Sequence, residues 1–219
     1  PTSRTSTGMS LTKQFWTSQG YAILDVNYRG STGYGRKYRD ALLGKWGVSD
    51  ADDIRNGVRY LIKQNIVNPG QIVIRGGSAG GYVVQRALTE FPDLFKCGAS
   101  YFGISDLETL VKLTHKFESQ YLTGLIGKPY PSGKSIYKER SPINHLDRLR
   151  SSMIIFQGSD DKIVPPRVSR QMSKALEARG IPCKYVEYSG EAHGFRMKES
   201  NIDALKKEAE FYRRNLKFI

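Results

Sequence analysis

Short apolar segments typical of β-strands alternate with longer segments of helical periodicity along nearly the whole chain. The strand-like segments are YAILDVN (21–27), QIVIR (71–75), KCGASYF (96–102), SMIIFQ (152–157) and CKYVEY (183–188). This alternation predicts an α/β fold, in which a mostly parallel sheet is covered by helices on both faces. Nothing else in the sequence restricts the architecture as strongly.

Helical segments separate the expected strands. The clearest one, residues 49–64, places acidic side chains such as Asp50 at its start and an apolar stripe along one side, which suits the positive end of a helix. Further helices are expected at residues 10–19, 37–43, 79–89, 168–176 and 202–216. Residues 104–150 are less regular. No linker or repeat interrupts the 219 residues, so one domain spanning residues 1–219 is expected.

Residues 76–80 read G-G-S-A-G, a G-x-S-x-G motif that lies between an expected strand and an expected helix. A serine on so tight a turn projects its hydroxyl above the sheet, and we expect Gly76 and Gly80 because a Cβ there would collide with the neighbouring strand or helix. The N–H of Ala79, at a helix N-terminus, would face an oxyanion formed by attack of Ser78 on a carbonyl. The motif predicts a nucleophile.

A nucleophilic serine needs a base, and the sequence contains three histidines, His115, His145 and His193. The first two lie in the irregular region ahead of the strand SMIIFQ. Only His193 follows the last strand, in a glycine-flanked loop that suits a tight and exposed turn. Elimination therefore predicts His193 as the base.

The acid that orients the base is found in the same way. Of the aspartates after Ser78, only the adjacent Asp160 and Asp161 leave the end of a strong strand, residues 152–157. One of the two must be a loop cap or turn residue. The residues by themselves leave both open.

Five motifs together resemble the catalytic domain of the prolyl oligopeptidase family. They are NYRGSTGYG, GGSAGGY, HKFESQY, DDKIVPP and GEAHGF. The bacterial dipeptidyl aminopeptidases and acylaminoacyl peptidases are the members that the chain resembles most. The resemblance implies an α/β-hydrolase fold and a serine peptidase that cleaves short peptides through an acyl-enzyme, with no metal or organic cofactor.

The resemblance also assigns residues. It implies Asp161 as the acid, because the family's acid lies three residues after the glycine that ends the strand, here Gly158. It places Phe102, Ile104 or Leu107 near an apolar substrate slot, although membership of the core explains each of them equally well. HKFESQY is expected to have a structural or pocket-wall role, since no second His or Cys cluster completes a metal site.

Two departures from the family pattern stand out. Gln157 occupies a position where many members have histidine. The chain also begins at Pro1, the proline of the family's H-G-G-P loop, so half of the oxyanion hole, the central strand leading into that loop and an upstream β-propeller are expected to be missing. Omission of a central strand would leave unpaired backbone groups and an open core on both of its flanks, at a cost of several kcal/mol. We therefore expect a fold that lacks its N-terminal strands and depends on the missing segment as a partner.

Charge and cysteine usage bear on partners and location. The net charge of +13 arises from 34 basic and 21 acidic residues, but the cations are scattered and accompany no nucleic-acid module, so we expect a solvated basic surface. No apolar run reaches the roughly 18 residues of a membrane helix. Cys97 and Cys183 have apolar neighbours and predict buried thiols in a reducing, cytoplasmic compartment. The oligomeric state stays open.

Three alternatives are compatible with parts of the sequence. A glycine-rich connection or phosphate loop would explain the glycines, but no GK[ST] follows. A carboxylesterase would use the same triad, because the triad does not distinguish esters from amides. A non-catalytic basic module would use the positive surface but leaves the ordered triad unexplained. Arg29 is expected to bond to loop carbonyls or to a substrate carboxylate.

Overall fold

The computed structural model describes residues 1–113 and 116–216. Its strands are β1 (Val73–Gly77), β2 (Cys97–Tyr101), β3 (Ser152–Gly158) and β4 (Cys183–Tyr188). They form one sheet in the order β1-β2-β3-β4, and all three neighbouring pairs are parallel. The expected parallel sheet is confirmed.

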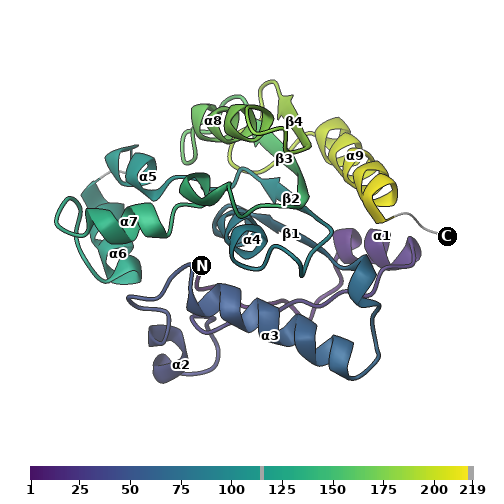
Figure 1. Cartoon of the computed structure of the whole chain (residues 1–219), viewed down its shortest axis with the longest axis horizontal. Coiled ribbons are helices and arrows are strands. Elements are labelled where there is room, and N and C mark those ends of the chain that lie inside the picture. The colour runs from purple at the N-terminus through teal and green to yellow at the C-terminus, as the bar shows by residue number, and fades with distance from the viewer. Residues whose placement is uncertain (114–115, 217–219) are drawn as a thin grey trace.

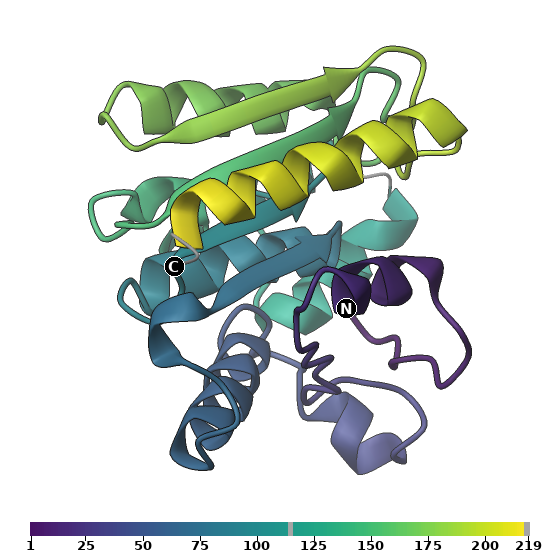
Figure 2. The same cartoon turned by 90° about the vertical axis from the view of Figure 1, so that its right-hand side faces the viewer.

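Helices lie on both faces of this sheet (Figures 1 and 2). They are α1 (Leu11–Ser18), α2 (Arg36–Asp40), α3 (Ser49–Lys63), α4 (Ala79–Glu90), α5 (Leu107–Leu113), α6 (Lys116–Ile126), α7 (Lys134–Glu139), α8 (Pro166–Glu177) and α9 (Lys198–Leu216). Two 3-10 turns, η1 (Pro69–Gln71) and η2 (Pro142–His145), complete the described elements. Helices α4 and α8 cover one face, and α9 crosses the other.

Local sequence explains where several elements begin and end. Helix α3 starts with acidic side chains in its first turn, and α8 starts at Pro166, whose fixed φ suits a first helical position. Gly180 follows α8 with a φ of +68°, a left-handed conformation that favours glycine. Every residue of β3 is buried because helices cover both faces of the sheet there.

The structure corrects one expected strand. Residues 21–27 form no strand, although their apolar pattern predicts one. A cavity of about 760 Å³, here named the β1 cavity, lies between residues 21–26 and residues 72–76, which include most of β1. In the sheet order, β1 pairs only with β2. Residues 21–27 therefore have a strand's composition but are paired with none of the described strands, and pairing is what stabilises a strand.

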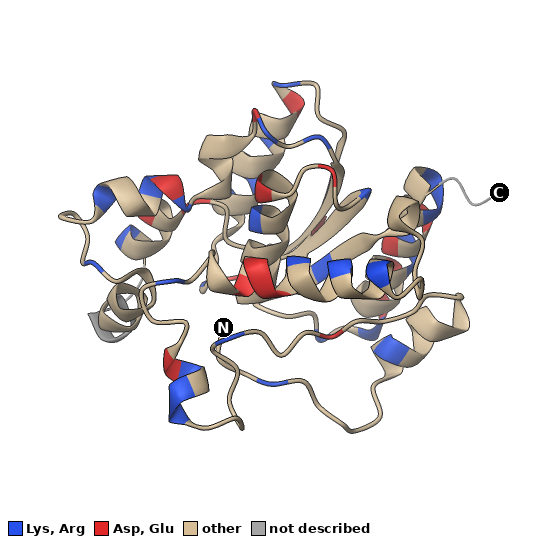
Figure 3. Ribbon diagram, turned by 60° about the horizontal axis from the view of Figure 1, so that its bottom comes forward, with Lys and Arg blue, Asp and Glu red and all other residues tan. Residues whose placement is uncertain are grey.

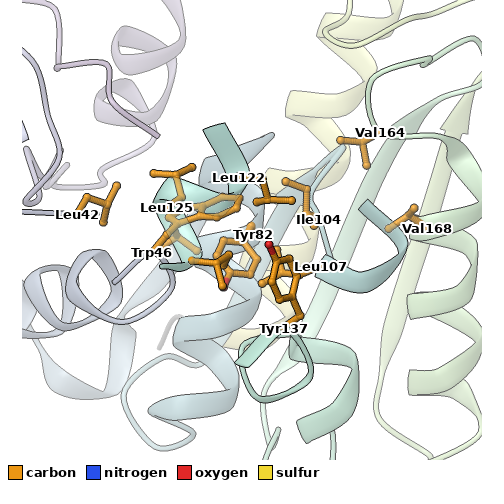
Figure 4. Close-up of a cluster of buried hydrophobic side chains, with 12 residues drawn as sticks. Leu42, Trp46, Tyr82, Ile104, Leu107, Leu122, Leu125, Tyr137, Val164 and Val168 are labelled. Atoms are coloured by element: carbon orange, nitrogen blue, oxygen red, sulfur yellow. The ribbon is translucent and has the colours of Figure 1, made fainter. Parts of the chain in front are cut away.

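The core supports the turn that carries Ser78. Helix α4 is buried along residues 81–89 and packs against β1 and β2. On its outer side, Tyr82 joins a cluster that reaches from Trp46 to Val168 (Figure 4). On the other face of the sheet, Trp16 and Tyr212 pack against the central strands. The helix behind Ser78 is thus held on several sides.

The charged residues are spread over the helices and loops rather than gathered on one element (Figure 3). Acidic residues are interspersed with the basic ones along the ribbon in the same view. Within the described ranges, no helix is long and apolar enough to cross a membrane. Cys97 is buried, Cys183 is half-buried, and both are free thiols.

Candidate active site

Ser78 lies on a strained turn between β1 and α4. Its φ of +54° and ψ of −119° are unusual for a residue with a Cβ, and its N–H donates to the carbonyl of Tyr101 at 2.9 Å. A Cβ on Gly76 would lie 2.5 Å from the carbonyl oxygen of Gly80, so glycine is required there as expected. The expectation for Gly80 is wrong, because a Cβ there would meet nothing within 4 Å.

His193 lies in the loop after β4. Gly190 and Gly194 flank this loop with φ values of +75° and +105°. The carboxylate of Glu191, whose residue is 2% exposed, accepts hydrogen bonds from the N–H groups of Arg196 at 2.8 Å and Met197 at 2.9 Å. Glu191 thereby closes the loop that carries His193, a role that sequence reasoning missed.

Asp161 lies in the loop after β3 and is 3% exposed. Its Oδ1 accepts hydrogen bonds from the N–H groups of Ile163 and Val164, both at 2.9 Å. The neighbouring Asp160 is exposed and its carboxylate accepts a hydrogen bond from Ser159 at 2.7 Å. The structure therefore distinguishes two aspartates that the residues by themselves leave equivalent.

The structure brings Ser78, His193 and Asp161 together. Nε2 of His193 lies 2.8 Å from Oγ of Ser78, and Nδ1 lies 2.8 Å from Oδ2 of Asp161. The other histidines do not take part: His145 lies in η2 with Nε2 2.6 Å from a backbone carbonyl, and His115 lies outside the described residues. A base is thus positioned on the hydroxyl, and a carboxylate orients that base.

The carboxyl group of Asp161 is held in its charged form. Burial by itself raises the pKa of Asp161, but hydrogen bonds from His193, Val164 and Ile163 outweigh burial, and the pKa is lowered from its ordinary value. At neutral pH the group is therefore a carboxylate. Such a group accepts from Nδ1–H of His193 and leaves Nε2 as the atom that receives a proton.

A further side chain, Gln157, touches the acid. Its Nε2 donates to Oδ2 of Asp161 at 3.1 Å, the same oxygen that His193 contacts. Gln157 departs from the family pattern, but sequence reasoning assigned it no role. A polar side chain at the carboxyl end of the apolar strand β3 is the signal that indicates this position.

The three expected pocket residues lie in different places. Phe102, with a φ of +39°, places its ring centroid 4.8 Å from that of His193. Ile104 and Leu107 are 6% and 0% exposed and belong to the hydrophobic cluster around Tyr82 (Figure 4). Phe102 is thus the member of the three that contacts the site, and the pocket assignment stays a prediction.

A cavity of about 580 Å³, here named the Ser78 cavity, opens beside the nucleophile. Its lining includes Tyr28, Ser78 and Ala79, the first residue of α4. Within the described ranges, no group of three or more His, Cys, Asp or Glu side chains is arranged to hold a metal ion. Arg29 forms a bidentate ion pair with Asp53 at 2.8 and 3.0 Å, and it also donates to the backbone carbonyl of Ser49 at 3.4 Å. The expected bond to a backbone carbonyl therefore lies beside an ion pair that the sequence did not indicate, and a role on a substrate carboxylate stays a prediction.

The sequence model of the prolyl oligopeptidase family matches residues 7–218. The chain belongs to the prolyl oligopeptidase family. The expected family and the α/β-hydrolase fold are therefore confirmed, and the serine, the acid and the histidine of this family member occur in the order that the fold requires.

Three relatives show the level of similarity. This family member is 37% identical over 205 residues to dipeptidyl aminopeptidase BIII of Pseudoxanthomonas mexicana, a match that covers 92% of this chain and 30% of the relative. The structure of a puromycin-hydrolyzing peptidase of Mycobacterium tuberculosis superposes with a TM-score of 0.97 and 44% identity, over 100% of this chain and 33% of that one. The structure of an acylaminoacyl peptidase of Pyrococcus horikoshii superposes with a TM-score of 0.86 and 28% identity, over 95% of this chain and 34% of that one.

This family member spans about a third of the length of the relatives that it matches. The matched third of each relative corresponds to the sheet and helices described above. The remaining two thirds of those relatives have no counterpart in residues 1–219.

Proposed function

We propose that this protein is a serine peptidase that hydrolyses short peptides, and that residues 1–219 form its catalytic domain. The observation that carries the proposal is the pair of 2.8 Å contacts that link Ser78, His193 and Asp161. Membership of the prolyl oligopeptidase family supports the same chemistry.

The reaction proceeds through an ester on Ser78. Oγ of Ser78 attacks the scissile carbonyl carbon while Nε2 of His193 takes its proton, and Asp161 stabilises the imidazolium that results. The N–H of Ala79 stabilises the oxyanion. When the C–N bond breaks, His193 gives its proton to the leaving amine. Water then attacks the ester carbonyl while His193 takes a proton from it. When the C–O bond to Ser78 breaks, His193 returns that proton to Oγ of Ser78 and the carboxylic acid product is released.

Short peptides are the proposed substrate class. The names of the relatives include a dipeptidyl aminopeptidase, a puromycin-hydrolyzing peptidase and an acylaminoacyl peptidase, all of which describe hydrolysis of small amide substrates. A panel of chromogenic aminoacyl, dipeptidyl and N-acyl substrates, with ester analogues beside them, separates these activities from an esterase. Because esters are intrinsically more reactive than amides, the diagnostic result is activity on the amides: efficient hydrolysis of the amide substrates would support a peptidase, and hydrolysis of the esters alone would indicate an esterase.

A strand of the same polypeptide is the proposed partner of the domain. The β1 cavity lies along the outer edge of β1, whose other edge pairs with β2, and residues 21–26 form its far wall. This arrangement suits an extended segment that donates and accepts backbone hydrogen bonds in the cavity. The greater length of the relatives supports a segment ahead of Pro1 as that strand.

Replacement of the nucleophile tests the function. In the full-length protein, Ser78→Ala should abolish covalent labelling by a fluorophosphonate probe, because the alkoxide oxygen that attacks the probe is removed. Ser173→Ala is the control, since Ser173 is a buried serine on α8 whose hydroxyl bonds to Glu177 at 3.1 Å. Labelling that persists in Ser78→Ala would overturn the assignment.

A further inference from the structure

The strand β3 ends in a buried glutamine that no step of the proposed reaction uses. Gln157 is 0% exposed, and its amide nitrogen lies 3.1 Å from both Oδ2 of Asp161 and the carbonyl of Val164. Its amide oxygen accepts a hydrogen bond at 2.6 Å from the hydroxyl of Ser169, which is 1% exposed on α8. Both ends of the amide are therefore occupied.

Only one orientation of this amide satisfies its neighbours. Oδ2 of Asp161 and the carbonyl of Val164 are acceptors, so they require the nitrogen of Gln157 on their side. Ser169 supplies a donor to the opposite atom. A reversed amide would place its oxygen against two acceptors in a buried site, where such a repulsion is not screened by water. The two acceptors thus fix which atom of Gln157 faces the acid, and Ser169 holds the opposite atom in place.

The carboxylate of Asp161 then has a full set of donors. Oδ1 accepts from the two backbone N–H groups of Ile163 and Val164, and Oδ2 accepts from Gln157 and His193. Four hydrogen bonds hold both oxygens in place. A carboxylate free to rotate would not keep Oδ2 directed at the imidazole.

We propose that Gln157, fixed by Ser169, is a positioning residue that orients the Asp161 carboxylate for catalysis. This inference rests on the proposed function, because it assigns a task within the same triad. An amide suits the task since it donates without carrying a charge and does not titrate, so its support of the acid is the same at every working pH. An apolar side chain could fill the space of Gln157, but it would donate no hydrogen bond to Oδ2 of Asp161.

Gln157→Glu in the full-length protein tests the donor with little change of shape. As an anion, the introduced carboxylate cannot donate and lies against Asp161, so kcat/KM should fall by about 10- to 100-fold at about pH 8. When the pH is lowered, the new carboxyl group takes up a proton and donates through its O–H. The ratio of variant to wild-type kcat/KM should therefore rise by about 10-fold between about pH 8 and about pH 6. A ratio that is independent of pH would overturn the inference.

Gln85→Glu is the matched control for burial of a charge. Gln85 is 1% exposed on α4 and donates to Ser100 at 3.0 Å, so the same substitution there introduces a buried carboxylate without contact to Asp161. The folded fraction of this variant is measured by circular dichroism, and its activity is given per folded molecule. The ratio of its kcat/KM to that of the wild type should not change with pH. A rise equal to that of Gln157→Glu would show that charge burial, and not the lost donor, causes the effect.

Ser169→Ala keeps the inference testable if Gln157→Glu fails to fold. Loss of the hydroxyl leaves the buried amide oxygen of Gln157 without its donor and the amide less firmly held, and kcat should fall by about 5-fold with KM unchanged, the effect of one neutral hydrogen bond. Ser173→Ala, one turn along the same helix and equally buried, should leave kcat unchanged. Equal kcat in the two variants would overturn the inference. Fluorophosphonate labelling of the wild type separates the two proposals, since an unlabelled wild type would overturn the function itself.

Discussion

Asp50 is a carboxyl group that the fold buries away from the triad. It lies in the first turn of α3, is 0% exposed, and neither of its oxygens has a well-aligned hydrogen-bond partner among the described residues. Burial raises the pKa of Asp50 from 3.8 to about 6. Nearby backbone N–H groups favour a carboxylate at this end of the helix, but the removal of water opposes the charge more strongly.

The raised pKa predicts a loss of stability as the pH rises. Between pH 3.8 and about 6, folded Asp50 keeps a proton that the unfolded chain has released, so the free energy of unfolding falls through this range and stays lower above it. Asp50→Asn removes this titration. Its free energy of unfolding should gain about 3 kcal/mol relative to the wild type between about pH 4 and pH 8.

Urea unfolding at the two pH values measures this difference. Asp52→Asn in the same helix is the control, because its side chain is 35% exposed and keeps much of its contact with water. The free energy of unfolding of that variant should differ from the wild-type value by a similar amount at both pH values. A constant difference for Asp50→Asn as well would contradict the desolvation of Asp50.

At the scale of elements, the strand-turn-helix unit of β1, Ser78 and α4 determines the site. The positive φ of Ser78 reverses the chain so abruptly that Gly76 on β1 lies against the backbone of Gly80 in α4. Similar close contact joins β3 to the loop of His193, where a Cβ on Gly158 would lie 2.4 Å from the carbonyl oxygen of Glu191. Glycines therefore set how tightly the Ser78 turn closes and how closely the loop of Asp161 approaches the loop of His193.

A pair of substitutions in the turn checks this account. Gly76→Ala should lower the free energy of unfolding by about 2 kcal/mol and reduce labelling of Ser78, because its methyl group would push β1 away from α4. Gly80→Ala, at which a Cβ meets nothing within 4 Å, should retain the wild-type stability. Urea unfolding of both variants provides the comparison, and equal losses of stability would contradict it.

At the scale of the whole molecule, the active site lies at the carboxyl ends of the parallel strands. The loops after β1, β3 and β4 carry Ser78, Asp161 and His193, and parallel strands bring these loops to the same end of the sheet. The same sheet is incomplete at its other side. The outermost strand, β1, is separated from residues 21–26 by the β1 cavity. A domain with this edge is expected to gain stability from an added strand.

Chain length tests that expectation. Residues 1–219 expressed alone should unfold with low cooperativity and show weak activity, whereas a protein that includes the natural upstream segment should unfold cooperatively and be fully active. Hydrogen exchange at the amides of β1 should be slower in the longer protein, because the added strand would accept their hydrogen bonds. A cooperatively folded and fully active monomer of residues 1–219 would contradict the proposed strand.

Local pattern and chain order by themselves determined much of this protein. Four of the five expected strands and the main helices follow from periodicity, because a buried face repeats every two or every 3.6 residues whatever lies opposite. Ser78 follows from its glycine motif, and His193 from being the one histidine placed after the last strand. These features depend on neighbours in the sequence.

Only the tertiary structure decided the features that depend on distant partners. Residues 21–27 have the composition of a strand but pair with none of the described strands. Asp160 and Asp161 are adjacent and chemically identical, so local pattern leaves both open; the family resemblance implies Asp161, and the fold of the loop supplies the physical reason because it directs Asp161 at His193. The role of Gln157 likewise depends on Ser169 from another element, because hydrogen bonds act over about 3 Å in space, whatever the separation along the chain.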